Sequence, residues 1–307
     1  MHNHTTTESV RLDKVVAAFP SVSSRSRAKD AISTGKVLID GEVCTEVGFM
    51  VPAGCEVQLQ WNRPGTGKDR VAGKKGLLEA GLDIVFEDEH LVAVCKPSGM
   101  LTDTASVEQH RTRDSVWKRL RAYLRASGDL PRTVHRIDRD TSGVVLFART
   151  DPAEYNLRDQ FRKHKPTRSY LALIHAKPSW DENEWLDWTR WNGAARKLVK
   201  IPDDGDGGKE TRCHVTVRRR FIRNASEIEV RLHTGRRNQI RLQAAVRGYP
   251  LLGERLYVDR PWGMKVPRQM LHARTLGVVH PITGRPITLR ARIPSDYARA
   301  VSLLSRE

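Results

Sequence analysis

The sequence predicts an α+β fold in which a large domain with a mixed, mainly antiparallel sheet follows a small α/β domain. Apolar runs typical of strands occur at residues 83–86, 91–95, 144–147, 170–175, 213–217 and 228–232. Helical stretches interrupt them without regular alternation, notably Val116–Leu124 and Ala153–His164. This pattern favours a mixed or antiparallel sheet over a nucleotide-binding parallel sheet. A stretch rich in Gly, Pro, Lys and Arg at residues 61–80 is interpreted as a linker between the domains.

The composition indicates a soluble globular protein with a positive surface. Of 307 residues, 53 are Lys or Arg and 36 are Asp or Glu, so the formal net charge is +17. This charge favours nucleic acid as a partner, although an Arg-rich genome would also produce it. No apolar run approaches the roughly 20 residues that span a bilayer. The sequence also has no secretion signal and no CxxC pair. We therefore expect a cytoplasmic protein without membrane contact.

The small domain is predicted to consist of two helices, a hairpin and a further strand. Residues 1–9 are polar and are expected to form a flexible tail. Apolar residues from Val10 recur at helical spacing until Pro20, and Ser23 or Ser24 can cap a second, basic helix. A hairpin at residues 37–43 turns at Asp-Gly, the dipeptide that suits a two-residue turn, and a strand at residues 55–59 completes the domain.

Residues 10–60 resemble the small RNA-binding domain of ribosomal small-subunit protein four. The resemblance rests on RLDKVV at residues 11–16, SSRSRAKDAISTGKVLIDGEV at 23–43 and AGCEVQL at 53–59. Within the second helix, basic side chains four residues apart can meet one stretch of phosphate backbone. We expect RNA contacts from Arg25, Arg27, Lys29 and Lys36. The alternative is a basic helix that is merely solvated.

In the large domain, at residues 81–307, a dense polar block precedes the apolar strand at residues 144–147. Its carboxylates, Asp138 and Asp140, stand among Arg136 and Arg139. Cations within a few ångströms lower a carboxylate pKa by about 1–3 units, and an ionised carboxylate can act as nucleophile or base. The residues by themselves equally allow a plain turn in which these side chains satisfy backbone groups.

The nonamer HRIDRDTSG at residues 135–143 resembles the HR[LI]DxxTSG signature of RluA-type pseudouridine synthases. Further family segments follow the same order along the chain, at residues 87–99, 168–172, 235–242 and 248–253. The resemblance runs from about residue 81 to near the C-terminus. It implies the pseudouridine synthase catalytic fold and the isomerisation of uridine to pseudouridine in structured RNA, with neither cofactor nor metal. Large-subunit ribosomal RNA is the first expected substrate and transfer RNA the second.

The resemblance also assigns roles to residues. Asp138 is the implied nucleophile and Arg241 its ion-pair partner. Tyr170 is implied to pack against the target uracil and is also a candidate acceptor of its C5 proton. Whether Asp138 attacks the ribose or the base stays open, and the target base must be flipped out of its stack. His135 is expected to brace the loop by a hydrogen bond. The basic residues expected to hold the RNA are Arg136, Arg139 and Arg236.

Some residues depart from the family pattern. Asn238 and Gln243 stand where histidine is usual, and Cys95 stands where asparagine is common. These changes bear on the substrate subclass more than on the reaction. The tryptophan-rich segment Trp180–Trp191 could stack on bases, but its composition favours a packing role.

Two other functions are compatible with the charge. A non-catalytic RNA-binding protein of ribosome assembly would explain residues 10–60, but it gives no reason for Asp138, Tyr170 and Arg241 each to occur in a family motif. A DNA-binding regulator would need a recognition helix and dimerisation signals that are not found. We therefore expect a monomeric RNA-modifying isomerase that does not act on DNA.

Overall fold

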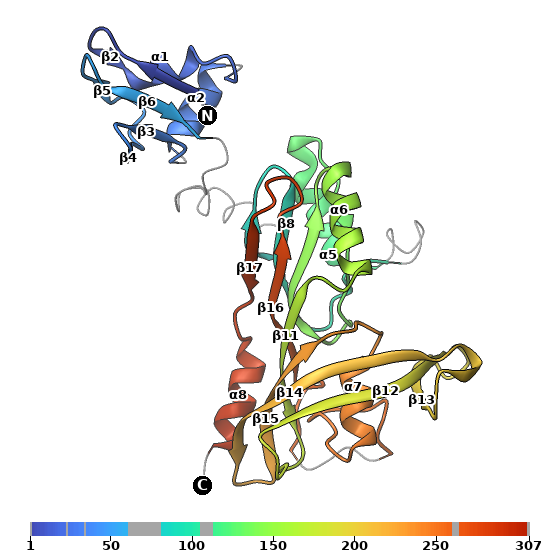
Figure 1. The fold of residues 1–307 in the computed structure, drawn as a ribbon. Helices are drawn as coiled ribbons and strands as arrows, with labels where there is room; N and C mark the ends of the chain where they lie inside the picture. Colours follow the sequence, from blue (N-terminus) through green and yellow to red (C-terminus); the bar gives the residue numbers. More distant parts are fainter. Residues whose placement is uncertain are drawn as a thin grey trace. The chain divides into compact units, whose positions relative to one another are not determined.

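A computed structural model describes residues 2–22, 24–33, 35–60, 81–104, 113–259 and 264–305 of the chain (Figure 1). The chain forms two compact units, Met1–Gly76 and Leu77–Glu307. The expected linker at residues 61–80 lies outside the described residues. Each unit has its own hydrophobic core.

The first unit packs two helices, α1 (Leu12–Ala17) and α2 (Arg25–Ser33), against small sheets. One sheet has the order β1 (His2–Thr5), β6 (Glu56–Leu59), β3 (Val37–Ile39) and β4 (Glu42–Val43), and β2 (Val10–Arg11) pairs with β5 (Met50–Val51). Asp40 and Gly41 have positive φ angles of 48° and 84°, as the predicted hairpin turn requires. Ser24 caps α2, because its hydroxyl accepts a hydrogen bond from the backbone N–H of Arg27 (3.2 Å).

The expectation of a flexible tail at residues 1–9 is wrong for its first part. Strand β1 pairs antiparallel with β6, from His2 opposite Leu59 to Thr5 opposite Glu56. The next residue, Thr6, is buried and donates its hydroxyl hydrogen to the carbonyl oxygen of Pro52 (2.6 Å). Without β1, the edge of β6 would have unpaired backbone groups. The side chains of β1 are polar, but its pairing with β6 uses backbone hydrogen bonds, so polar composition alone does not predict a flexible tail.

The second unit is built on one sheet of eleven strands. Nine of them follow the order β13-β12-β14-β15-β11-β16-β10-β8-β7, while β17 pairs with β16 and β9 with β10. Among the described strands the β10–β16 pair is parallel and the other pairs are antiparallel, which confirms the expected mixed, mainly antiparallel sheet. The bounds are β7 Asp83–Glu87, β8 Leu91–Lys96, β9 Arg132–Thr133, β10 Ser142–Ala148, β11 Thr167–Ile174, β12 Glu182–Asn192, β13 Lys197–Ile201, β14 Lys209–Phe221, β15 Ala225–Leu232, β16 Leu271–Val279 and β17 Pro286–Arg290.

Helices cover both faces of this sheet, because side chains alternate along each strand. In β10, Leu146 packs with α6 (Asp151–Arg162), whereas Phe147 packs with α5 (Val116–Leu124) on the other face. In β11, Ala172 packs with α7 (Gln239–Val246), whereas Leu173 packs with α8 (Ser295–Leu304) on the other face. Tyr170 packs against the apolar residues beneath α5 and also against those beneath α7, so these two helices lie on the same face of the sheet.

Several elements were not predicted, among them α7, α8, β16 and β17. The tryptophan-rich segment forms β12, which together with β14 makes a long ribbon that ends at β13 (Figure 1). Two short 3-10 helices, η1 (Arg125–Ser127) and η2 (Gly205–Gly207), complete the unit. Within the described part of the chain, no helix combines the length and the apolar character needed to cross a bilayer.

Candidate active site

The polar loop that contains Asp138 is attached to the sheet through His135. The backbone N–H of Leu146 in β10 donates to His135 Nε2 (2.9 Å), and the imidazole stacks on Phe161 with centroids 4.7 Å apart. Burial, aided by the charge of Arg168, lowers the pKa of His135 to about 3, so the ring is neutral and can accept this bond. This geometry confirms the expected bracing role.

Two buried cations hold the backbone of the same loop. Lys96 is fully buried, and its Nζ donates to the carbonyl oxygen of Arg139 (2.7 Å) and to two carbonyl oxygens of its own turn (2.8 and 2.7 Å). Arg268 donates to the carbonyl oxygen of Asp140 (3.2 Å) and to Ser142 Oγ (3.0 Å). Burial lowers the pKa of Lys96 to about 7, against the opposing charge of Asp140. Sequence reasoning missed Arg268, which lies outside the quoted motifs.

Asp138 is half-buried and lies beside Asn238, the residue that precedes α7. With its amide nitrogen facing the carboxylate, Asn238 donates to both oxygens of Asp138, at 2.8 and 3.2 Å. The reverse orientation would set the amide oxygen against two carboxylate oxygens. Burial raises the pKa of Asp138 above its ordinary value, and the positive charges that oppose this shift are led by Arg241 and Arg237.

Arg241 does not form the expected ion pair with Asp138. Its guanidinium instead makes two parallel bonds to the carboxylate of Glu254, at 2.8 and 2.7 Å. Among the described residues, no basic side chain lies within 4.0 Å of the Asp138 carboxylate. The reason is that Glu254 is buried beside Arg241 and matches the planar fork of the guanidinium. Although burial alone would raise the pKa of Glu254, its bonds to Arg241 hold that pKa below its usual value.

Tyr170 lies on β11 at an irregularity in its pairing with β16, where the register shifts between Ser169 and Tyr170. Such irregularities are frequent beside active sites, because they redirect a side chain. Burial raises the pKa of Tyr170 to about 12, and the charge of Asp138 contributes to that shift. The structure therefore brings together the three residues predicted to be catalytic, Asp138, Tyr170 and Arg241, although Arg241 acts on Asp138 without contacting it directly.

The residues of the second unit that are predicted to bind RNA differ in their surroundings. Arg136 is exposed on the loop, and Arg139 is exposed and pairs with Asp140 (3.2 Å). Arg236 is half-buried, and its Nε is enclosed without a hydrogen-bond partner.

Within the first unit, Arg25 forms an ion pair (3.2 Å) with the buried carboxylate of Asp13. Arg25 thus has a structural contact in addition to its predicted role. Arg27 and Lys29 are exposed on α2, and Lys36 is half-buried.

Asn238 and Gln243, which stand where the family usually has histidine, lie in different surroundings. Gln243 is fully buried, and its amide donates to Asp187 Oδ2 (2.9 Å) within a network beneath the ribbon. Asn238, in contrast, contacts the candidate nucleophile. Of the ribbon tryptophans, Trp185 is buried and stacks on Tyr249, as the packing interpretation predicts, whereas Trp191 is 38% exposed.

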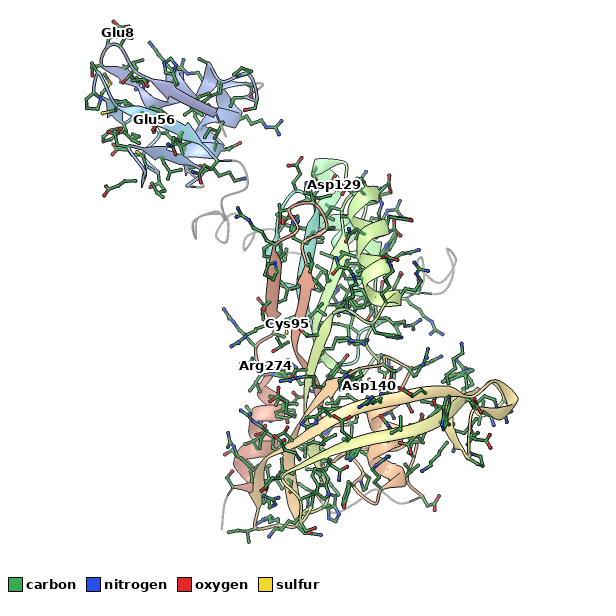
Figure 2. All side chains as sticks on the ribbon, in the orientation of Figure 1. Glu8, Glu56, Cys95, Asp129, Asp140 and Arg274 are labelled. Atoms are coloured by element: carbon green, nitrogen blue, oxygen red, sulfur yellow. The ribbon has the colours of Figure 1, made fainter. Side chains whose placement is uncertain are left out.

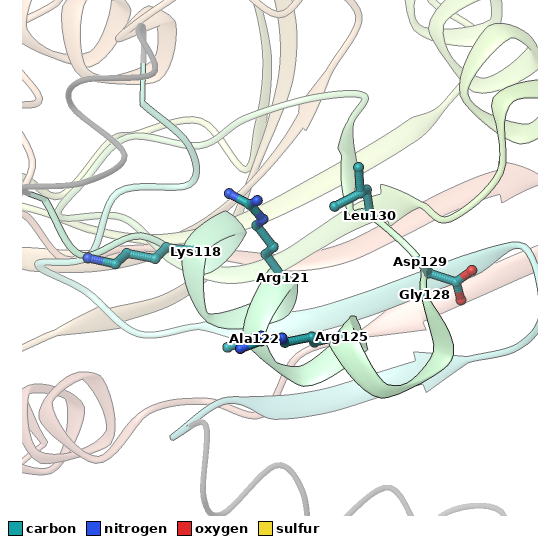
Figure 3. Close-up of a pocket in the computed structure, with 7 residues that line it drawn as sticks. All are labelled: Lys118, Arg121, Ala122, Arg125, Gly128, Asp129 and Leu130. Carbon is teal, nitrogen blue, oxygen red and sulfur yellow. The ribbon is translucent and has the colours of Figure 1, made fainter.

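A separate hollow of about 580 Å³ lies beside α5 and η1 (Figure 3). Its lining contains three basic residues and one acidic residue and comprises Lys118, Arg121, Ala122, Arg125, Gly128, Asp129 and Leu130. Figure 2 shows Asp129 well separated from Asp140, so this hollow is not part of the candidate site. Across the described ranges, no three His, Cys, Asp or Glu side chains gather in a way that could hold a metal ion.

Comparison with known families gives two matches. Residues 90–246 match the family described as RNA pseudouridylate synthase, and residues 10–57 match the S4 domain.

Individual proteins are similar over most of the chain. The ribosomal large subunit pseudouridine synthase D of Zymomonas mobilis is 32% identical over 96% of this chain and 93% of its own length. The dual-specificity RNA pseudouridine synthase RluA of Escherichia coli K12 is 33% identical over 71% of this chain and 95% of its own length. The solved structure of human RNA pseudouridylate synthase domain containing 4 has a TM-score of 0.60 at 18% identity, covering 77% of this chain and 97% of that one. This structural likeness concerns the fold.

Proposed function

Because the chain belongs to the RNA pseudouridylate synthase family and is thus an RNA-modifying isomerase, we propose that it isomerises specific uridines of structured RNA with Asp138 as nucleophile. The observation that carries the proposal is the position of Asp138. It lies in the HRIDRDTSG loop and receives two hydrogen bonds from Asn238. It is close enough to Arg241 to feel that positive charge, and close enough to Tyr170 for its own charge to help raise the pKa of the phenol.

The reaction begins when the target uridine leaves its stack, which costs a few kcal/mol and is easiest in a loop or bulge. The ionised Asp138 attacks either the ribose carbon or the uracil ring, and the C1′–N1 bond breaks. The uracil then turns in place, and C1′ bonds to C5 as the bond to the Asp138 carboxylate breaks. The C5 proton passes to water and N1 gains a proton, so the product is an isomer of the uridine. No electron is transferred in this sequence of steps.

Two neighbouring side chains support this chemistry. The positive charge of Arg241 favours the ionised form of Asp138 against the effect of burial. Because the raised pKa keeps the Tyr170 phenol protonated at neutral pH, its side chain is better suited to packing against the uracil than to accepting the C5 proton. The exposed Arg136 and Arg139 are placed to hold the RNA backbone beside the loop.

We propose large-subunit ribosomal RNA as the substrate, since a relative that matches nearly the whole chain is a ribosomal large subunit synthase. Transfer RNA is the second candidate. The S4 unit adds an RNA-binding surface through the basic face of α2. We further propose that the protein acts as a monomer in the cytoplasm, where its four free cysteines would stay reduced.

The test compares Asp138→Asn with Asp140→Asn, which removes the same charge two positions away. Large-subunit ribosomal RNA and transfer RNA transcripts labelled with tritium at uracil C5 release the label when pseudouridine forms. We expect Asp138→Asn to release none and to bind RNA within a few-fold of the wild type, whereas Asp140→Asn remains active. Turnover by Asp138→Asn at the wild-type rate would refute the nucleophile.

Mapping of pseudouridine in RNA from cells with and without the gene would then identify the modified uridine. If no uridine depended on the gene while the protein bound ribosomal RNA tightly, the non-catalytic alternative would replace this proposal.

A further inference from the structure

The ionised form of Asp138 is disfavoured by burial, and Arg241 does not contact its carboxylate. A nucleophilic carboxylate must be ionised, yet burial favours its neutral form. Two of the three guanidinium nitrogens of Arg241 bond Glu254, and the third, Nη1, lies 3.4 Å from the Asn238 amide and not at Asp138. The residue that touches the Asp138 carboxylate is instead Asn238.

Asn238 has an unusual backbone for the start of a helix. It occupies the N-cap position of α7 with φ 57° and ψ 19°, in the left-handed region that asparagine tolerates better than most residues. An N-cap asparagine ordinarily accepts a hydrogen bond from its own helix, but this side chain makes no such bond. Its amide is turned towards Asp138 instead, so its position is explained by the site and not by capping.

The surroundings of Asn238 hold its amide in one orientation. The residue is 8% exposed, and its amide lies between the Asp138 carboxylate and the hydroxyl of Tyr257. The Tyr257 hydroxyl also accepts the backbone N–H of Leu198 (3.1 Å), which ties it to β13. The amide atom on the Asp138 side lies 2.8 and 3.2 Å from the two carboxylate oxygens and 3.4 Å from Arg241 Nη1. Because the two acceptors are closer than the one donor, a nitrogen fits this position better than an oxygen, and the amide oxygen then faces the Tyr257 hydroxyl.

We propose that Asn238 is a positioning residue for Asp138: its amide donates to both carboxylate oxygens, fixes the rotamer of the carboxylate and stabilises its ionised form. This inference rests on the proposed function, since it assigns a role within that reaction. An amide does not titrate, so Asn238 gives this support at every pH. Loss of the two bonds should raise the apparent pKa of Asp138 by about one to two units.

The test measures single-turnover tritium release against pH, with transcribed large-subunit ribosomal RNA labelled at uracil C5. For Asn238→Ala we expect a lower maximal single-turnover rate and a nearly unchanged RNA concentration for half-maximal rate. We also expect an acidic limb of the rate profile shifted upward by about one to two pH units. Asn224→Ala is the matched control, because Asn224 also has a positive φ, of 46°, but lies in the turn between β14 and β15. It should leave the profile unchanged.

Two further variants keep the proposal testable if Asn238→Ala folds poorly. Asn238→Asp has the same shape but sets a carboxylate against Asp138, so it should be less active than Asn238→Ala at neutral pH. Asn238→His restores an N–H donor in either protonation state, so it should recover part of the rate lost in Asn238→Ala.

An unshifted acidic limb in a folded Asn238→Ala, or an Asn238→Asp as active as the wild type, would overturn the proposal. If these results occurred while Asp138→Asn was inactive, only the role of Asn238 would fail. If the wild type itself released no tritium, the proposed function would fail.

Discussion

Gly143 is the last residue of the HRIDRDTSG motif and has no side chain that could take part in the reaction. Replacing it with alanine therefore tests how strongly the fold depends on close backbone packing beside the candidate site. Gly143 pairs with Ala273 where β10 and β16 run parallel, and it has a φ of 128°. A Cβ atom at this position would lie 2.2 Å from the carbonyl oxygen of Ala273 and 2.6 Å from its nitrogen. Because both atoms belong to the backbone of a central strand, no side chain can move aside to relieve the clash.

The magnitude follows from two contributions. The disallowed φ costs on the order of 1–3 kcal/mol, and forcing an extra carbon into packed backbone costs about 1–3 kcal/mol. We therefore expect Gly143→Ala to lower the free energy of unfolding of the second unit by about 2–6 kcal/mol. Gly284→Ala is the matched control, because Gly284 has a φ of 69° but nothing within 4 Å of the added carbon. Its cost should be about 1–2 kcal/mol.

The assay is urea unfolding followed by tryptophan fluorescence, for which the buried Trp185 reports on the second unit. If folded Gly143→Ala protein is obtained, its loop must shift, so kcat should fall more than RNA affinity. Equal unfolding midpoints for Gly143→Ala and Gly284→Ala would refute the argument from close strand approach.

Three further predictions concern the residues around the loop. Lys96→Met removes the ammonium that binds three carbonyl oxygens, so it should destabilise the second unit by about 1–3 kcal/mol and reduce kcat; a normal melting temperature and rate would contradict this. Glu254→Gln leaves Arg241, whose side chain is 12% exposed, without its buried charged partner and should cost about 3–5 kcal/mol in urea unfolding. Glu184→Gln, at an exposed pair with Arg212, should cost about 0–1 kcal/mol. The pKa of His135 falls from 6.5 to about 3 on folding, so between these pH values the unfolded chain binds more protons than the folded chain. The contribution of His135 to the free energy of unfolding is therefore lost as the pH falls from 6.5 to about 3. The difference in unfolding free energy between the wild type and His135→Gln should therefore narrow from pH 6.5 to pH 4. A constant difference would contradict a neutral His135 in the folded protein.

The sequence by itself determined the features that depend on near neighbours in the chain. The basic face of α2, the Asp-Gly turn and the strand after Gly143 all follow from local spacing, and the structure has each of them. The nonamer and its companion motifs were specific enough to identify the catalytic family, because each is a short contiguous run. For the same reason, the candidate nucleophile Asp138 could be named before its surroundings were known.

Only the tertiary structure decided which side chains meet Asp138. Asn238 precedes α7 and Asp138 precedes β10, so their contact depends on the pairing of strands that lie between them in the chain. The pairing of Arg241 with Glu254, and the hold of Arg268 on the loop, likewise depend on how distant segments pack. Hydrogen bonds of this kind are set by strand register and by competition among several possible partners. A linear pattern contains neither, since it records the order of residues and not the distances between them.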